Sequence, residues 1–520
     1  GRPSGRPASF SPALQLSSSP APSSPRPTAV TLPGGCEVLE NLTLAGVLAF
    51  LAHASIILGL GLRIISRRLP TGTSLAWLTL IIVAPLLGGL IYLLIGENRL
   101  GRRRAARAEE LRARFDPFAR EPAPDAPPTG AQAEGPIQQL VRNTGGYPAK
   151  AGPSLELFSD AQSILRSIIR DVDGARSTCH MEFYIWNPGG TADEVGEALL
   201  RAAGRGVACR VLLDSVGSAG FFKSPWPKRL RAGGVRLVRA LPVGLVRALF
   251  ERLDLRLHRK IVVVDGETAY TGSLNLVDPR YFKRGAGVGQ WVDCMVRVSG
   301  PAVGELQSVF MGDWVVETGE ILYEQPGPGL LVPLEPAGPT VVQAAPSEPA
   351  LGSREILRLL LMTVYSAQRE LVLTTPYFVP EESLLVALVT AAQRGVSVTI
   401  VLPAEVDSFL VRHASRSYFG ELAEAGVRIL CFRGGLLHSK TVTVDGEMAL
   451  IGTVNLDVRS FRLNFEVTLF AYDPGFCARL RGLQASYEAE SDPVQQESWW
   501  RRSGPARLLD DTVRLVGPLL

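Results

Sequence analysis

The sequence predicts an α/β protein made of two pseudo-symmetric α/β/α sandwich halves, preceded by two transmembrane helices. Three observations support this prediction: a polar motif that occurs twice, similar sequence around both copies, and two long apolar segments near the N-terminus. A repeated unit of this kind indicates a duplicated fold, and apolar segments of this length indicate a membrane anchor. The length of 520 residues and the hydrophobic content of 46% are sufficient for a duplicated fold and a membrane anchor.

The repeated polar motif is the most specific feature of the chain. Its first copy consists of His258, Lys260, Asp265, Gly272, Ser273 and Asn275, and its second copy of His438, Lys440, Asp445, Gly452, Thr453 and Asn455. The two copies lie 180 positions apart and have the same internal spacing. Because six positions recur at identical offsets, chance is a poor explanation.

The sequence around the motifs repeats as well. Residues 202–207 resemble residues 391–396, and residues 232–236 resemble residues 424–428. Each stretch is typical of a helix end, a glycine turn and a buried strand. We therefore expect two α/β halves and a Pro/Gly-rich connector. Their expected bounds are 155–325 for the first half, 326–349 for the connector and 350–490 for the second half.

The N-terminal region divides into a tail and two apolar segments. Residues 1–41 are rich in Pro and Ser and are predicted to be disordered. Residues 42–62 and 75–95 contain no Lys, Arg, Asp or Glu, and each is long enough to cross a hydrocarbon layer of about 30 Å. They predict a transmembrane helical hairpin at residues 42–96. Two buried helices of a soluble core are the alternative, disfavoured because such helices normally keep a charged face.

The segment after the hairpin, residues 97–154, is predicted to be a basic juxtamembrane linker. Its arginines outnumber those between the two apolar segments, which favours an orientation with the α/β halves on the cytoplasmic side of the membrane. Arginines at this place also suit anionic lipid headgroups. A cleaved signal peptide is disfavoured, since the first apolar segment lies too far from the N-terminus.

Cysteine usage and net charge exclude several classes of protein. The six cysteines contain no CxxC-type pair, so neither a zinc site nor a disulfide framework is indicated. The net charge of +4 is too small to indicate nucleic-acid binding by itself. We expect no metal and no other cofactor, and the oligomeric state stays open.

The motif residues are expected on adjacent strands. Strand alternation places His258 and Lys260 on one face, and the second copy does the same. Only six of the 54 basic residues are lysines, so lysine at this position suggests a point charge aimed at one oxygen. Asp265 and Asp445 are catalytic candidates, but the glycine that follows each favours a turn-forming role.

Two histidines, two lysines, two hydroxyls and two amides suit the chemistry of a phosphodiester. One imidazole can attack phosphorus while the other protonates the departing alkoxide. The lysines and the side chains of Ser273, Asn275, Thr453 and Asn455 can hold the phosphate oxygens as charge builds. A core role is reasonable for a lone histidine but not for two with matched polar partners.

Several sequence blocks resemble a known family. They are residues 183–190, 221–226, 258–265, 270–282, 375–380 and 436–457. The pattern is similar to the phospholipase D superfamily and, more narrowly, to bacterial cardiolipin synthases of the two-span type. The resemblance runs from about residue 42 to the C-terminus and implies a fold of two phospholipase D-like halves.

The resemblance implies that two phosphatidylglycerol molecules become cardiolipin and glycerol through a phosphatidyl-histidine intermediate. His258 would be the nucleophile and His438 the acid and base, with the order open between the halves. It also implies that a carboxylate downstream of each motif orients that motif's histidine. Glu466 matches this place in the second half and Asp293 in the first, where seven extra residues intervene. An ordinary strand-end role is the alternative for both carboxylates.

Two other functions remain open on the sequence. A hydrolytic phospholipase D or nuclease would pass the same intermediate to water, and a membrane scaffold would retain the fold without activity. Intact histidines and lysines disfavour the scaffold. The membrane spans disfavour a nuclease, which would need a broad basic surface. The expected partners are therefore phosphatidylglycerol, other anionic lipids and the bilayer, without nucleic acid.

Two further segments allow two interpretations each. Twelve extra residues precede His258 within residues 241–256, and form either an amphipathic helix at the bilayer surface or a core helix. The C-terminal tail, residues 491–520, carries Trp499 and Trp500 before an amphipathic stretch. It is either an interfacial anchor or a packing tail.

Overall fold

The computed structural model describes most of the chain beyond the N-terminal tail. The described residues are 35–67, 69, 71–97, 99–101, 103–110, 135–244, 247, 251–322, 334–349, 354–496, 499, 501–515 and 517. The predicted tail up to residue 34, the middle of the basic linker and the start of the connector lie outside these residues, as does most of the segment 245–250. The chain divides into two compact units, Gly1–Leu90 and Ile91–Leu520, which are considered separately.

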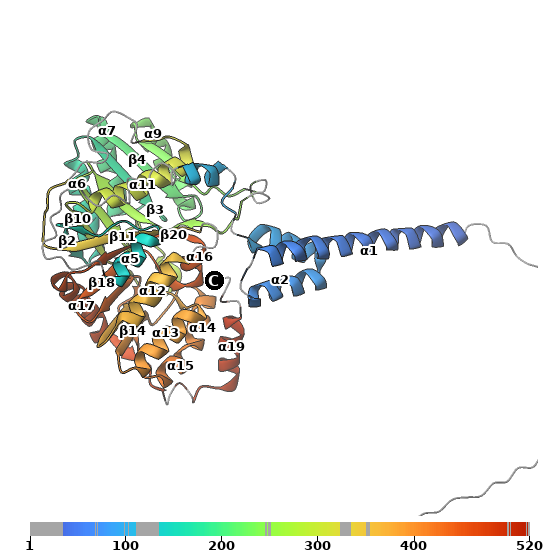
Figure 1. Ribbon diagram of the computed structural model, residues 1–520. Coiled ribbons are helices and arrows are strands. Elements are labelled where there is room, and N and C mark those ends of the chain that lie inside the picture. Colours follow the sequence, from blue (N-terminus) through green and yellow to red (C-terminus); the bar gives the residue numbers. More distant parts are fainter. Residues whose placement is uncertain are drawn as a thin grey trace, which may run out of the picture. The chain divides into compact units, whose positions relative to one another are not determined.

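The first unit contains a pair of apolar helices (Figure 1). Helix α1 (Gly35–Ser66) is unbroken, and its part Leu44–Ser66 is long and apolar enough to cross a membrane. Helix α2 (Thr71–Val83) returns beside it and packs against it. The apolar N-terminal helix predicted from the sequence is thus present.

The second predicted span is divided into shorter pieces. Helix α2 is followed by α3 (Pro85–Ile91) and a π-helical turn, η1 (Tyr92–Gly96). Pro85 has no N–H to donate and its ring crowds the preceding turn, so the regular helix ends at Val83. Among the described residues only α1 therefore has the length of a full span.

The first half of the second unit is built on a seven-stranded sheet with the order β2-β10-β8-β7-β3-β4-β5. The strands are β2 (Ser154–Phe158), β3 (Thr178–Phe183), β4 (Ala208–Asp214), β5 (Arg236–Ala240), β7 (Lys260–Val264), β8 (Thr268–Gly272) and β10 (Met295–Ser299). The neighbours β3, β4 and β5 are parallel, and the other pairs are antiparallel. Apolar residues of α6 (Ala161–Asp173) and α7 (Thr191–Gly204) join those of β3 and β4 in one buried cluster.

The second half repeats this arrangement in a ten-stranded sheet. Its main path is β1-β11-β20-β18-β17-β12-β14-β15-β21, and β6 is paired with β20. The strands are β1 (Lys150–Ala151), β11 (Val341–Ser347), β12 (Glu370–Thr374), β14 (Ser397–Pro403), β15 (Arg428–Phe432), β17 (Thr441–Val444), β18 (Met448–Gly452), β20 (Asn464–Ala471) and β21 (Ser491–Pro493). The predicted α/β fold is confirmed.

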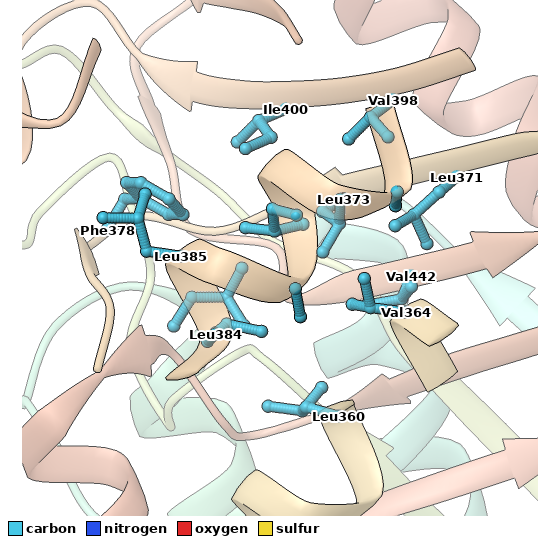
Figure 2. Close-up of a cluster of buried hydrophobic side chains, with 14 of the residues drawn as sticks. Leu360, Val364, Leu371, Leu373, Phe378, Leu384, Leu385, Val398, Ile400 and Val442 are labelled. Carbon is cyan, nitrogen blue, oxygen red and sulfur yellow. The ribbon is translucent and has the colours of Figure 1, made fainter. Parts of the chain in front are cut away.

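The core of the second half lies between this sheet and its helices, α12 (Glu355–Ser366) and α13 (Glu382–Gln393). Figure 2 shows Leu360 and Val364 of α12, and Leu384 and Leu385 of α13, with the strand residues they pack on. Those strand residues are Leu371, Leu373, Val398, Ile400 and Val442. Burial of such aliphatic side chains stabilises each half by about 1.5–3 kcal/mol per residue.

Part of the connector expected at residues 326–349 is a strand, β11 (Val341–Ser347). It pairs with β1 on one side and with β20 on the other, so it belongs to the second sheet. The Pro/Gly bias that suggested a connector ends near residue 340, and the following Val341 and Val342 favour a strand. Apolar residues of both sheets meet those of α11 (Val303–Thr318) and α17 (Pro474–Ala489) in one shared cluster.

Two short strand pairings join the halves directly. Strand β6 (Arg256–Leu257) runs parallel to the start of β20, at Asn464 and Phe465. Strand β16 (Leu436–Leu437) runs parallel to β9 (Trp291–Val292). Each pairing therefore ends beside a motif histidine of one half and a downstream carboxylate of the other.

Candidate active site

Each motif histidine directly follows one of these two-residue strands. The backbone N–H of His258 donates to Phe465 O at 2.9 Å, and that of His438 donates to Val292 O at 2.8 Å. The residues are 7% and 3% exposed respectively, so both imidazoles are largely shielded from water. The pairing between halves thus fixes the backbone at both histidines.

The histidine–carboxylate pairs are crossed between the halves. Nδ1 of His258 lies 2.8 and 2.9 Å from the two carboxylate oxygens of Glu466, and Nδ1 of His438 lies 2.6 Å from Oδ1 of Asp293. The expectation that each carboxylate orients the histidine of its own half is wrong, because β6 and β16 each cross to the opposite half. A carboxylate at Nδ1 holds the proton there, which leaves the Nε2 lone pair available.

Further hydrogen bonds hold the two carboxylates. The Ser273 hydroxyl donates to Asp293 Oδ1 at 2.6 Å, and Asn464 Nδ2 donates to Glu466 Oε1 at 3.0 Å. Thr453 Oγ1 accepts from the backbone N–H of Val467 at 2.9 Å. Burial alone would raise the pKa of Glu466, but the interaction with His258, including its hydrogen bond, and the positive charge of Lys260 outweigh burial, so that the pKa lies below its ordinary value. Both carboxylates are therefore held ionised and oriented.

The two motif lysines are buried beneath the histidines. Lys260 Nζ donates to His258 O at 2.6 Å, and Lys440 Nζ donates to His438 O. Burial lowers the pKa of Lys260 to about 7 and that of Lys440 to about 8. Each ammonium group is thus poorly solvated and available to stabilise an anion.

The two motifs share one electrostatic environment. Burial lowers the pKa of His258 to about 4 and that of His438 to about 3, so both imidazoles are neutral near pH 7. Lys440 contributes to lowering the pKa of His258, and Lys260 does the same for His438. Charges from either half therefore act on both rings.

Aromatic side chains flank both imidazoles. The Tyr184 ring lies 5.0 Å from that of His258, and the Trp291 ring lies 4.2 Å from that of His438. Lys283, from a loop of the first half, lies 5.3 Å above the Trp291 ring. Tyr184 follows the buried strand β3 and lay in one of the sequence blocks noted above, without a role assigned to it. Trp291 lies two positions before Asp293, outside those blocks, and no role was assigned to it either.

The two motif asparagines, each 17 positions after its histidine, differ in their hydrogen bonding. Asn275 Oδ1 accepts from the backbone N–H of Ile185 at 3.2 Å. Among the described residues, Asn455 Oδ1 is buried and has no hydrogen-bond partner. Since a buried polar atom without a partner is costly, the amide of Asn455 suits a bound ligand.

Asp265 and Asp445 are not brought to the histidines. Each follows the far end of its strand in a left-handed conformation, with φ of 53° and 55°. Asp265 accepts the backbone N–H groups of residues 176–178, and Asp445 those of residues 368–370, all at 2.7–2.9 Å. These contacts account for both aspartates as turn-forming residues.

Arg259 is a buried residue that the sequence analysis missed. It lies between the motif residues His258 and Lys260, where it pairs with Asp313 of α11. Its Nε donates to Glu466 O at 3.0 Å and its Nη2 to Ser347 O at 3.1 Å. Arg259 therefore connects the first motif to two strands of the second sheet and supports the residue that orients His258.

The described residues contain no group of three or more His, Cys, Asp or Glu side chains placed to hold a metal ion. The donors at this site are instead imidazoles, ammonium groups and amides. Such a set binds and transfers a phosphoryl-type group by nucleophilic attack and proton transfer.

Comparisons with known proteins agree with this chemistry. The family described as cardiolipin synthase, PLD-like domain, matches residues 168–314 and 360–484, which include both histidine motifs. The chain is 44% identical over 476 residues to cardiolipin synthase A of Erwinia tasmaniensis, covering 89% of this chain and 96% of that protein. It is 43% identical over 489 residues to cardiolipin synthase A of Escherichia coli, covering 92% and 99%.

A solved structure supports the fold independently. The phosphatidylserine synthase of Haemophilus influenzae superposes with a TM-score of 0.56, covering 74% of this chain and 100% of that one. The sequence identity is 17%, so this similarity concerns the fold alone.

Proposed function

The chain belongs to the cardiolipin synthase family with phospholipase D-like domains, and we propose that it joins two phosphatidylglycerol molecules into cardiolipin and glycerol. One observation carries the proposal: two neutral, buried imidazoles whose Nδ1 atoms are each held by a carboxylate of the opposite half. One ring can then act as the nucleophile and the other as the acid and base.

In the first step, Nε2 of His258 attacks the phosphorus of the first phosphatidylglycerol. The bond from phosphorus to the glycerol headgroup breaks, and His438 gives the leaving oxygen a proton, so that free glycerol departs. A phosphatidyl group remains on His258. The negative phosphate raises the low pKa of His438 and makes its protonated form accessible.

In the second step, a hydroxyl of the second phosphatidylglycerol attacks the same phosphorus. His438 takes the proton from that hydroxyl, the bond to His258 breaks, and cardiolipin is released. The ammonium groups of Lys260 and Lys440 and the amides of Asn275 and Asn455 stabilise the charge on the phosphate oxygens in both steps. Glu466 and Asp293 keep the two rings in the required tautomer.

We also propose the placement of the chain in the membrane. Both apolar segments, residues 42–62 and 75–95, would span a bacterial inner membrane and leave the catalytic halves on the cytoplasmic side. The first catalytic half would extend over residues 155–325, and the second over residues 350–490 together with strands β11 and β21 of its sheet. A fluorescent reporter fused to the C-terminus should fold and fluoresce, and a cysteine at Gly72 should react with an impermeant reagent only from outside. The opposite pattern would contradict this orientation.

The decisive experiment is to incubate the purified full-length protein with phosphatidylglycerol in mixed micelles and to separate the products. We expect cardiolipin and glycerol in equal amounts. His258→Ala and His438→Ala should abolish the reaction, whereas His53→Ala, a matched loss of an imidazole outside the site, should not. Phosphatidic acid without cardiolipin would indicate hydrolysis and contradict the proposal.

The identity of the nucleophile can be tested in the same system. After a denaturing quench at neutral to mildly alkaline pH, which preserves the acid-labile bond between phosphorus and the imidazole, we expect the labelled phosphatidyl group of the donor lipid on the peptide that contains His258. Label on the peptide that contains His438 would reverse the assigned roles and leave the overall reaction unchanged.

A further inference from the structure

Two neighbouring helices of the second half present a large apolar surface. Helices α14 (Phe409–Ser417) and α19 (Gly504–Arg514) lie side by side (Figure 1). Their large apolar side chains that remain 41–80% exposed are Phe409, Leu410, Leu508, Leu509 and Leu515, which directly follows α19. Exposed apolar side chains gathered on two neighbouring helices mark an interaction site.

The inner side of α19 is fixed to the second half. Asp510 accepts from His413 Nδ1 of α14 at 2.6 Å and also pairs with Arg502. Val513 is buried in the core of this half. Leu508 and Leu515 lie two helical turns apart on the side turned away from Asp510. The C-terminal segment is thus held by packing on one side and exposes leucines on the other.

The two groups of exposed side chains lie on helices that contact each other at His413 and Asp510. The Phe409 ring lies 4.4 Å from the ring of His413, which is the residue that binds Asp510 of α19. Trp499 is one of the two tryptophans noted in the sequence. Its ring lies 5.0 Å from that of Phe419, so it helps to hold the C-terminal segment against the second half. Trp500 and Val516 lie outside the described residues.

The charges around this surface favour an anionic partner. Arg501, Arg507 and Arg514 are exposed, and Asp511 is the exposed acidic residue in the described part of 501–515. Arg502 and Asp510 neutralise each other. Exposed leucines flanked by excess arginines are the combination that binds the interface of an anionic bilayer.

The surface is connected to the active site through a short series of contacts. Asp407, two residues before Phe409, accepts from Tyr377 OH and from Lys283 Nζ, each at 2.8 Å. Lys283 lies over the ring of Trp291, which in turn contacts His438. The exposed N-terminal end of α14 therefore lies near the second imidazole.

We propose that α14 and α19 form the face by which the catalytic unit rests on an anionic phospholipid bilayer, so that lipid headgroups enter beside His438. The inference rests on the proposed function for its substrate, while the contact with the bilayer can be measured without turnover. The membrane anchor keeps the protein at the bilayer, and this face sets the orientation of the catalytic unit on it.

The first test measures contact with lipid directly. In the full-length protein carrying Cys36→Ala and Cys431→Ala, an environment-sensitive dye is attached to Leu515→Cys, or to Glu447→Cys as the control. Glu447 is exposed and lies beside Asp445, at the strand end away from the histidines. In vesicles containing phosphatidylglycerol and a lipid-borne quencher, we expect strong quenching at residue 515 and little at residue 447. Equal quenching at both, or none at residue 515, would overturn the proposal.

A second copy of the chain is the alternative occupant of this surface. In detergent without a bilayer, dye emission at residue 515 should not change with protein concentration. A concentration-dependent shift there would indicate self-association and overturn the proposal.

The second test uses activity. Leu508→Glu should lower turnover of phosphatidylglycerol in vesicles by about tenfold and that of dispersed short-chain lipid by much less. Val386→Glu, the same substitution at an exposed position on α13, should change neither. Equal loss on both substrates would overturn the bilayer-docking role. A wild-type protein inactive on both substrates would contradict the proposed function, whereas the quenching result would still decide this inference.

Discussion

Asp293 of the first half binds the imidazole of His438 in the second, with Oδ1 2.6 Å from Nδ1. The pairing of β9 with β16 brings these residues together across 145 positions of sequence. Glu466 binds His258 in the reciprocal way. Each half therefore supplies the carboxylate that binds the motif histidine of the other half.

The crossed pairs predict the effect of neutralising either carboxylate. Asp293→Asn should disturb His438 and Glu466→Gln should disturb His258, since an amide no longer fixes the Nδ1–H tautomer. We expect kcat to fall by about 10²- to 10⁴-fold in each variant, with a smaller change in KM. Trapping should show slower formation of the phosphatidyl-enzyme in Glu466→Gln. Unchanged kcat in both variants would contradict the orienting role.

Asp265 should affect stability and leave the chemistry intact. Asp265→Ala removes the acceptor of three backbone N–H groups and places alanine at a φ of 53°, so we expect a loss of about 2 kcal/mol in unfolding free energy. Asp265→Asn tolerates the left-handed conformation and should lose less. Thermal unfolding in detergent measures this effect. A fall in kcat per folded molecule at unchanged melting temperature would instead indicate a catalytic role.

The buried lysines predict an alkaline limit to activity. The pKa of Lys260 is lowered to about 7 and that of Lys440 to about 8, and an ammonium group loses its charge as pH rises through its pKa. Since the charged form stabilises the phosphate, kcat/KM should fall as pH rises from about 7 to 9. Initial rates over this range test the prediction, with Lys223→Met expected to follow the wild-type profile. A rate that stays constant to pH 10 would contradict it.

Arg259 should be important for both stability and positioning. Arg259→Met leaves Asp313 buried beside Glu182, whose pKa is already raised first by burial and then by Asp313. Removing one partner of a buried ion pair costs about 3–5 kcal/mol. Asp313→Asn in the same chain should restore part of this loss, as measured by denaturant unfolding. Additive losses from the two substitutions would show that the pair is not coupled.

The sequence predicted where the motif residues lie because the motif repeats at fixed spacing. His258, Lys260, His438 and Lys440 could be placed in one site from two strands and the need for paired acid and base groups. The crossed carboxylates could not be predicted, because two-residue strands such as β6 and β16 carry no periodic signal. Arg259 was missed because a residue between two motif positions was expected on the opposite strand face, away from the site.

The limits at the level of the fold have similar physical causes. The hydropathy of residues 75–95 indicated one span, but the geometry of Pro85 divides the helix. The composition of the connector concealed β11, whose pairing partners β1 and β20 lie far away in sequence. The local sequence pattern thus indicated whether a segment forms a helix or a strand. The position of a strand in the sheet depends on pairing with residues far away in the sequence.

The exchange of short strands between the halves bears on how such a protein could arise. A polypeptide with a single motif would have a histidine with no carboxylate of its own chain to bind Nδ1. Its own carboxylate could bind only the histidine of another molecule. Two such polypeptides about a twofold axis would satisfy each other, and fusing their genes would keep them together at any dilution. The interval of 180 positions between His258 and His438 is what a fused dimer of this kind would leave behind.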